Sequence, residues 1–507
     1  MNIKDIIKYD LPASLVVFLV ALPLCLGVAL ASGAPLFSGV VAGIVGGIVA
    51  GSLSASPLSV SGPAAGLTTI VFLAISKLGS YEAFLLSVVL AGVIQVALGF
   101  MRAGSVGNFF PASVVKGMLA AIGIILILKQ VPHAVGYDLD FEGDESFIQG
   151  DGQNTFSEIS RALSSLTPGA IVISLVSFML LFLWEKPVVE KHKVFGLLPS
   201  PLVIVAVGIF LNWLFIHYIP ILEIEEKHRV SVPLLSAAQG LSSFFAFPDF
   251  SLWRDPRIYT TALTIAIVAS LETLLSIEAC DKLDPYRRIT PLNRELKAQG
   301  MANTVSGLLG GLPITSVVVR SSANINAGAK TKASTIAHGV ILLLSIVLIP
   351  EILRLIPLAC LAGLLIFVGY KLVKPELIRE MYQKGITQFL PFMVTIVAVV
   401  FTDLLQGVFC GILVAVFFIL KTNFRQSIIL VNNGSGFLLK FTKDVSFLNK
   451  STLRNMFQKI PPYATMVIDG SDSQFIDHDI KETIVDFIAS CKANNILVEL
   501  KNISLTK

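Results

Sequence analysis

Apolar runs long enough to cross a lipid bilayer recur along most of this chain and restrict its fold more than any other feature. A membrane-crossing helix needs roughly 17–25 predominantly apolar residues. Breaks at glycine and proline divide residues 11–420 into about fourteen such segments. Only 14% of the 507 residues are charged, against roughly a quarter in soluble domains. The sequence therefore predicts an all-α polytopic membrane domain over residues 1–425.

The first segment is too long for the apolar core of a cleaved signal peptide, so we expect it to be the first span. The expected segments lie near residues 11–32, 36–54, 57–76, 83–100, 109–131, 167–185, 198–216, 258–280, 298–311, 313–328, 333–350, 353–370, 388–403 and 405–421.

Charged residues alternate between the loops. Acidic residues dominate the loops around 138–145 and 223–226, whereas an alternate loop holds Lys282, Arg287, Arg288, Arg294 and Lys297. Positively charged loops stay on the cytoplasmic side of a membrane. The pattern predicts a bacterial inner-membrane protein with both termini in the cytoplasm.

Two segments, the third and the tenth, are interrupted near their middle. In the third, an extended stretch over 58–61 leads to Gly62-Pro63, where a helix can begin because proline suits the first helical turn. The tenth opens with Pro313, and its β-branched run over 315–319 favours a strand before small polar residues start a helix. Interrupted spans at corresponding places in two halves of a chain indicate a transporter's binding site.

The two breaks predict an anion site. Half-helices that begin at mid-membrane would aim their N-termini at one point, and each N-terminus acts as roughly half a positive charge with unused N–H groups. Arg320 falls beside the second break. An arginine at that depth costs at least roughly 2.5–3.5 kcal/mol on insertion scales, so it should face a partner or a wet cavity.

Glu272 is a second charged residue at membrane depth, midway along the eighth segment, and Ser276 follows one helical turn later. This pair suits a sodium ion or a proton relay; alternatively Glu272 neutralises Arg320, and both can hold together. Two helix ends and Arg320 total roughly +2, which an ionised Glu272 reduces to about +1 and a bound cation restores. The arithmetic favours cation–anion symport.

The order of these pieces resembles the SulP (sulfate permease-like) anion transporters, which include pendrin, prestin and bacterial sulfate, bicarbonate and dicarboxylate carriers. The resemblance covers nearly the whole chain. It implies a seven-plus-seven inverted repeat with core and gate domains, movement of the core against the gate, and a homodimer. It rests on Leu58-Ser-Val-Ser-Gly-Pro-Ala64, Ser270-Leu-Glu-Thr-Leu-Leu-Ser276, and Arg320 followed by Gly328-Ala-Lys-Thr331.

The resemblance also implies the binding residues. The Ala21-Leu-Pro-Leu24 pattern is similar to bacterial bicarbonate carriers, whereas many other relatives have glutamine in place of Leu24 and an aromatic residue in place of Val28. The implied substrate-binding residues are Pro23, Leu24, Val28, Ser61, Gly62, Pro63, Ala64, Val319, Arg320, Ser321 and Ser322. The implied cation-coupling residues are Glu272, Ser276, Ser316 and Val317, with Glu272 and Ser276 as ligands of a sodium ion.

Residues 426–507 read as a small cytoplasmic α/β domain. We expect strands at 437–441, 465–468 and 496–500 and helices at 450–460 and 480–494. This order is similar to the STAS domain that ends SulP chains, in a shortened form with a packing or dimer-stabilising role. Soluble relatives carry a phosphorylated serine where this chain has His478, so no phosphoswitch is expected.

The expected function is secondary active transport of a small inorganic anion of the bicarbonate or sulfate class, coupled to sodium or protons. A dicarboxylate carrier and a channel-like anion conductor remain alternatives. A nucleobase–cation symporter would need acidic side chains facing its substrate rather than Arg320. No enzyme is expected, because the histidines are scattered and the five cysteines form no metal-binding pattern. The expected partners are the anion, co-transported Na⁺ or H⁺, the lipid bilayer and a second copy of the chain, without cofactor, catalytic residue or nucleic acid.

Overall fold

The computed structural model describes residues 6–138, 147, 154–184, 199–230, 245–425, 427–432, 434 and 436–505. The chain separates into two compact units, Met1–Ile412 and Leu413–Lys507. The domain limits expected from the sequence, 1–425 and 426–507, stay a prediction.

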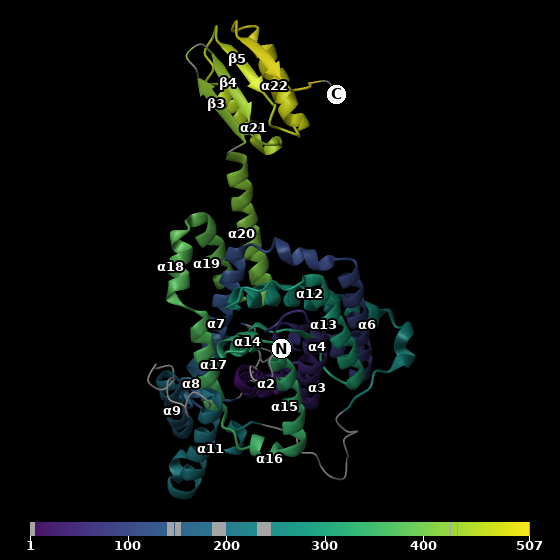
Figure 1. The fold of residues 1–507 in the computed structure, drawn as a ribbon, viewed down its shortest axis with the longest axis vertical. Helices are drawn as coiled ribbons and strands as arrows, with labels where there is room; N and C mark the ends of the chain where they lie inside the picture. The colour runs from purple at the N-terminus through teal and green to yellow at the C-terminus, as the bar shows by residue number, and fades with distance from the viewer. Residues whose placement is uncertain are drawn as a thin grey trace. The chain divides into compact units, whose positions relative to one another are not determined.

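Two groups of helices make up the first unit, and the helices of each group pack mainly on one another (Figure 1). The first group contains α2 (Leu11–Ala31), α3 (Leu36–Val45), α4 (Gly51–Leu53), α5 (Thr68–Leu78), α6 (Tyr81–Phe100), α12 (Pro256–Leu283), α13 (Leu292–Leu309), α14 (Val318–Asn326) and α15 (Ala333–Leu348). The second contains α7 (Ala112–Ala134), α8 (Thr155–Ser164), α9 (Pro168–Trp184), α11 (Ser200–Tyr218), α17 (Leu358–Leu372), α18 (Pro375–Gln383) and α19 (Ile386–Phe401). The short helix α16 (Pro350–Leu353) connects the two groups and packs on α15. Helix α20 (Leu404–Arg425) follows and contains the boundary between the two units.

Short helical turns connect these helices. They are η1 (Ile6–Asp10), η2 (Gly46–Ala50), η3 (Ala65–Leu67), η4 (Ala103–Phe109), η6 (Pro220–Leu222), η7 (Glu226–His228) and η9 (Phe250–Arg254).

The helices of the first seven expected segments, up to α11, and those of the last seven, from α12 on, pack on one another in equivalent pairs. Helix α6 packs on α12 and α13, and α15 packs on α2 and α3 in the same relation. In the second group, α19 packs on α7 as α17 packs on α9. A helix of each half thus packs on the first two helices of the other half.

Glycine allows the closest of these contacts. A β-carbon added to Gly47 in η2 would lie 2.6 Å from the α-carbon of Gly339 in α15. No side chain fits between backbones at that separation, so small residues set the approach of α3–η2 to α15.

Each of the fourteen expected apolar segments corresponds to a helix or to a strand followed by a helix. Within the described ranges, eight helices are long and apolar enough to cross a membrane, and the bent pair α8–α9 raises this to up to nine. Three further apolar helices are shorter: Ala65–Leu78, Ala333–Leu348 and Ile386–Phe401. The chain is therefore a mostly helical membrane protein, and the number of crossings stays a prediction.

The second unit carries a four-stranded sheet with the order β3-β4-β5-β6, and its strands and helices are drawn in yellow and yellow-green in Figure 1. Strands β3 and β4 are antiparallel, and the other neighbours are parallel. Phe457 stacks on Phe487 with ring centroids 3.8 Å apart. The elements are β3 (Ile428–Asn432), β4 (Phe437–Phe441), η10 (Phe447–Asn449), α21 (Lys450–Phe457), β5 (Thr465–Asp469), α22 (His478–Cys491) and β6 (Leu497–Lys501).

The three strands and two helices expected from the sequence in this unit are confirmed. Strand β3 was not predicted. Its residues Ile428–Asn432 come soon after the apolar helix α20, so the end of one apolar run and the start of the next are hard to separate by pattern.

Candidate functional site

Two short, buried strands pair with each other inside the first group of helices. Strand β1 (Ser61–Pro63) pairs antiparallel with β2 (Ile314–Ser316), so that Ser61 lies opposite Ser316 and Pro63 opposite Ile314. Strand β1 leads through η3 into α5, and β2 leads into α14. The two helices therefore begin at opposite ends of the strand pair. Both interruptions lie in the segments where the sequence indicated them, whereas the convergence of the two N-termini on one point stays a prediction.

The strand limits differ from those expected at 58–61 and 315–319. Helix α14 begins at Val318 because Ser321 N–H already donates to the Val317 carbonyl at 3.0 Å. The Ser321 hydroxyl also accepts from Val60 N–H at 3.0 Å. These contacts outweigh the strand preference of the β-branched run.

Both helix starts lack a side-chain cap. No capping hydrogen bond forms at Val317, before α14, or at Ala64 and Leu67, before η3 and α5. The first N–H groups of a helix have no partner within the helix. The backbone at both starts is thus left with donors and the positive ends of two helix dipoles, which suit an anion.

Arg320 lies in the first turn of α14, and only 1% of its surface is exposed. Its Nη1 atom lies 2.0 Å from the place that a β-carbon on Gly62 would occupy and 4.0 Å from the corresponding place on Gly43. Arg320 Nε and Nη1 donate no hydrogen bond to any described residue. The guanidinium faces the protein interior with donors to spare, and a charged group in that position can bind an anion strongly.

The first segment adds an apolar wall. Pro23 lies inside α2, and Leu24 and Val28 follow on the same helix with 6% and 3% of their surfaces exposed. Helix α2 packs against β1, α5 and α14. The first, third and tenth segments, far apart in the sequence, thus meet at the strand pair.

The expected cation-coupling residues approach the same pair from α12. Glu272 is buried, and its carboxylate lies 3.3 Å from the place of a β-carbon on Gly66 in η3. Ser276 is buried one turn later. Glu272 therefore lies at the beginning of α5, whereas the guanidinium of Arg320 lies against Gly62 and Gly43.

Strand β2 is tied to its surroundings next to these residues. Ser316 N–H donates to the Thr273 hydroxyl of α12 at 3.4 Å, and the hydroxyls of Ser316 and Ser59 are 2.9 Å apart. Val317 N–H donates to the Val60 carbonyl at 3.0 Å. Ser316 thus connects β2 to α12, and Val317 connects the end of β2 to the segment before β1.

The serine hydroxyls expected to bind substrate make contacts within the protein. Ser61 accepts from Gln299 Nε2 at 2.6 Å. Ser321 donates to the Val317 carbonyl, and Ser322 donates to the Val319 carbonyl, each at 2.8 Å. Pro63, Ala64 and Val319 are buried beside them.

Sequence reasoning missed a polar stripe on α13. Its side chains are spaced by one helical turn and are all buried: Glu295, Gln299, Asn303 and Ser306. Polar residues at i, i+4, i+8 and i+11 within an apolar segment were the signal that could have found it.

This stripe holds both strands. Gln299 bonds Ser61 of β1, and Asn303 both accepts from Ile314 N–H at 2.5 Å and donates to the Ile314 carbonyl at 2.9 Å. Asn303 Nδ2 also donates to Gln95 of α6 at 2.7 Å. Helix α13 therefore holds both strands in place through side-chain hydrogen bonds.

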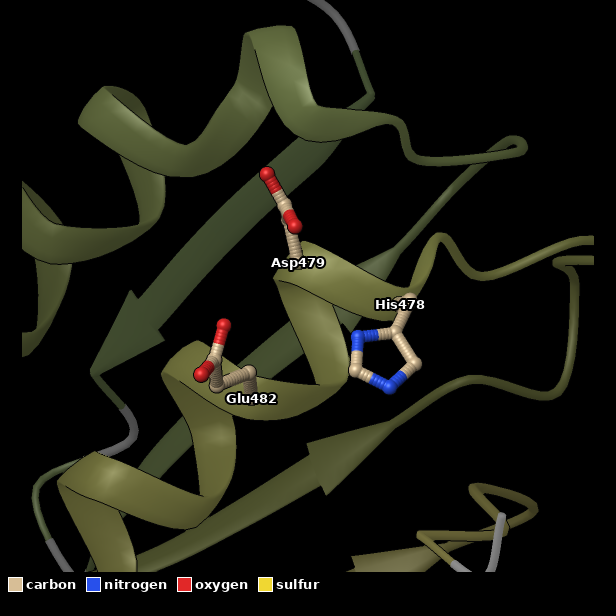
Figure 2. A group of neighbouring side chains, drawn as sticks. All are labelled: His478, Asp479 and Glu482. Atoms are coloured by element: carbon tan, nitrogen blue, oxygen red, sulfur yellow. The ribbon is translucent and has the colours of Figure 1, made fainter.

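One group of side chains in the second unit has metal-ligating chemistry. His478, Asp479 and Glu482 lie on the first turns of α22, with ligand atoms within 4.8 Å of one another (Figure 2). The three are exposed or partly exposed, and Asp479 lies 4.0 Å from the ammonium of Lys450. Acidic residues at a helix N-terminus are stabilised by the helix dipole without any metal, so these residues do not indicate a metal centre.

Known proteins resemble this chain over nearly its whole length. The bicarbonate transporter BicA of Picosynechococcus sp. is 26% identical over 418 residues, which are 81% of this chain and 69% of BicA. The sodium-independent sulfate anion transporter of Bos taurus is 24% identical over 465 residues, 88% of this chain and 75% of that protein.

A solved structure resembles the fold, and a family pattern matches the sequence. The structure of the murine solute carrier 26 family member A9 anion transporter in the inward-facing state aligns with 99% of this chain and 87% of its own at a TM-score of 0.68, with 17% identity. The pattern described as the sulfate permease family matches residues 7–398. The chain belongs to the sulfate permease family, the SulP group of membrane anion transporters.

Proposed function

We propose that this protein is a secondary active transporter of a small inorganic anion of the bicarbonate or sulfate class. The observation that carries the proposal is the buried Arg320, whose Nε and Nη1 have no hydrogen-bond partner among the described residues, beside two helix starts without side-chain caps. Relatives named for bicarbonate and for sulfate transport support the same substrate class.

The charge at the strand pair suits an anion of charge −1 or −2. Two helix N-termini contribute roughly half a positive charge each, and Arg320 contributes one, for a total of roughly +2. The proposed substrate-binding set is Pro23, Leu24, Val28, Ser61, Gly62, Pro63, Ala64, Val319, Arg320, Ser321 and Ser322.

The proposed coupling ion is Na⁺ or H⁺, bound at Glu272 with Ser276, Ser316 and Val317. The carboxylate of Glu272 lies near the start of α5, so its negative charge lowers the positive field that an anion meets there. A cation at Glu272 would remove that effect and strengthen anion binding. No other cofactor is proposed.

The proposed mechanism moves the first group of helices, as a core domain, against the second group, as a gate domain. The exchange of equivalent contacts between the halves supports a seven-plus-seven inverted repeat. We place the protein in the bacterial inner membrane as a homodimer, with both termini and a STAS-like domain, residues 426–507, in the cytoplasm.

Two alternative functions share the site. A dicarboxylate carrier would present two carboxylates to the same positive charge, and a channel-like conductor would use it without a coupled cycle. A nucleobase–cation symporter is disfavoured because the guanidinium of Arg320 lies against Gly62 of the strand pair, and its Nε and Nη1 have no hydrogen-bond partner among the described residues. An enzyme is disfavoured because the family is described as sulfate permeases and its named relatives are transporters.

Uptake into proteoliposomes tests the proposal. The purified full chain is reconstituted, and labelled bicarbonate, sulfate and succinate are offered with and without an inward sodium gradient and an inward proton gradient. Saturable uptake of bicarbonate or sulfate that a cation gradient accelerates supports the proposal. Uptake of succinate alone supports the dicarboxylate carrier, large unitary currents in planar bilayers support the conductor, and no flux of any of these anions rejects anion transport.

A further inference from the structure

A histidine lies fully buried on the side of Arg320 that faces α15. His338 has 0% of its surface exposed, and neither of its ring nitrogens has a hydrogen-bond partner among the described residues. A neutral imidazole has one donor and one acceptor nitrogen. Buried polar atoms without a partner are rare in folded proteins, so a histidine with two of them calls for a functional explanation.

The face of α15 that carries His338 meets the guanidinium. Leu342, one turn after His338 on the same face, lies 2.9 Å from the place of a β-carbon on Gly43, and Arg320 Nη1 lies 4.0 Å from that place. Arg320 is close enough to His338 for the two to interact electrostatically. The helix face that carries His338 and the guanidinium of Arg320 therefore both approach Gly43, and each of these two groups has unused polar atoms.

Few other titratable groups surround His338. Helix α15 packs on α2, α3, η2, α4, η1 and α16. Segments α3, η2 and α4 contain no ionisable residue, α2 contributes Cys25, and α16 contributes Glu351 beyond the end of α15. At the opposite end, η1 contributes Lys8, Tyr9 and Asp10, and the Asp10 carboxylate is occupied by Lys330 N–H and by Thr331. Arg320 is thus the charge that governs His338.

We propose that His338 is a proton-binding site that takes up one proton when an anion binds beside Arg320 and releases it when the anion leaves. The inference rests on the proposed anion transport and adds a proton site on α15, separate from Glu272 on α12. The proton comes from water on the side of the membrane to which the site is open, binds a ring nitrogen of His338, and leaves to water on the other side with the anion.

Electrostatics gives the direction of the coupling. With no anion bound, a second positive charge beside Arg320 is repelled. A bound anion cancels that repulsion, so protonation of His338 becomes easier. By reciprocity, protonation of His338 raises the affinity for the anion by the same factor. Anion affinity therefore rises as pH falls.

Proton uptake measured during anion binding tests this coupling. Sulfate is the first probe, because it keeps the same charge throughout the neutral pH range, and bicarbonate is the second. Purified full-length protein in weakly buffered nanodiscs receives the anion at pH 6 to 8, and a pH-indicator dye reports proton uptake while calorimetry reports binding. Burial of His338 also opposes protonation, so we expect up to about one proton per anion in the wild type, with the largest uptake at pH 6. The apparent affinity should fall by up to about tenfold per pH unit towards alkaline pH.

His338→Gln keeps a polar side chain of similar size and cannot take up a proton in this range. We expect proton uptake near zero and a flat pH profile in His338→Gln. The matched control His217→Gln, at the exposed end of α11, should retain the proton signal.

The outcomes separate the two proposals. Wild-type protein that binds an anion without taking up a proton overturns the His338 inference and leaves anion transport standing, and this result needs no variant to fold. Proton uptake in His338→Gln equal to that of the wild type also overturns it. If the wild type neither binds nor transports sulfate or bicarbonate under any gradient, both proposals fail.

Discussion

A β-carbon on Gly62 would lie 2.0 Å from Nη1 and 2.9 Å from Cζ of Arg320. The guanidinium therefore occupies the space that any other residue at position 62 would fill. Because Gly62 belongs to β1 and Arg320 to α14, this contact fixes the charge of the tenth segment against the break of the third. Arg320 can hold this position only because residue 62 has no side chain.

Replacing Gly62 with alanine should displace the guanidinium and reduce anion uptake by at least about tenfold, since a small misplacement of a binding group can have effects of that size. Uptake by the reconstituted variant, at matched protein amount, checks the prediction. Gly363→Ala in α17 is the matched control, because its new β-carbon would lie 3.2 Å from the β-carbon of Ser177, a contact that a slight shift can relieve. Uptake of Gly62→Ala equal to that of Gly363→Ala would contradict the prediction.

Arg320→Gln should lower the affinity for the anion without lowering the stability of the fold. Removal of the charge should lower anion affinity by about 10- to 100-fold, the range of a lost charge-assisted hydrogen bond. The variant should nevertheless unfold at the same or a higher temperature, because a buried charge with unpaired donors destabilises the folded state. Uptake and thermal unfolding in detergent are measured on the same preparation. A variant that is clearly less stable than the wild type would indicate that Arg320 serves the fold.

The sequence revealed the parts of the site that local chemistry controls. Gly62-Pro63 and Pro313 marked both breaks, and the strand–helix pairs lie there, because proline and glycine restrict the backbone wherever they stand. Apolar length likewise predicted the apolar helices of the first unit, with limits that differ by a few residues, but not the helices α8 and α18. These features need no knowledge of distant contacts.

The parts that depend on distant contacts could not be predicted. The start of α14 at Val318 is set by bonds from Ser321 and Val60, and this start determines which way Arg320 points. The support of the strands by Gln299 and Asn303 also needs the three-dimensional packing of α13. The sequence shows which side chains can donate hydrogen bonds but does not show which acceptors they will meet in the fold.

Glu272→Gln should make anion uptake insensitive to the sodium gradient. The amide keeps the size of the side chain but has no charge for a cation to neutralise, so the anion should meet the same field with or without sodium. Initial uptake rates with sodium or choline outside test this. Glu82→Gln, at an exposed position at the start of α6, is the control and should keep the wild-type response. An unchanged sodium or proton stimulation in Glu272→Gln would exclude Glu272 as the coupling site.

Asn303→Leu should weaken both stability and anion binding. It removes the bonds to Ile314 N–H and carbonyl and leaves buried backbone groups unpaired, at about 1–3 kcal/mol for each group. With β2 less firmly held, the KM for the anion should also rise. Thermal unfolding and the concentration dependence of uptake are measured beside Thr304→Val, which alters the neighbouring residue while preserving its shape. A variant with normal stability and a normal KM would show that α13 does not support the strand pair.

Asp138, which lies outside the membrane-spanning helices, should make the stability of the protein decrease at acid pH. Its carboxylate is buried between His133 and His228 and accepts a hydrogen bond from each. Burial alone would raise the pKa of Asp138, but the two hydrogen bonds outweigh it and hold the pKa below its usual value of 3.8. A group with a lowered pKa stabilises the fold at neutral pH, and this contribution disappears as the pH falls below about 3.8 and through the folded-state pKa.

Asp138→Asn should therefore lower the free energy of unfolding by about 2 kcal/mol at pH 7, and the difference from the wild type should shrink below about pH 4. Thermal unfolding between pH 3 and pH 7 measures it. Glu223→Gln, an exposed acidic position in the neighbouring loop, should match the wild type at every pH. A deficit in Asp138→Asn that stays constant down to pH 3 would mean that the ionised carboxylate is not what stabilises this cluster.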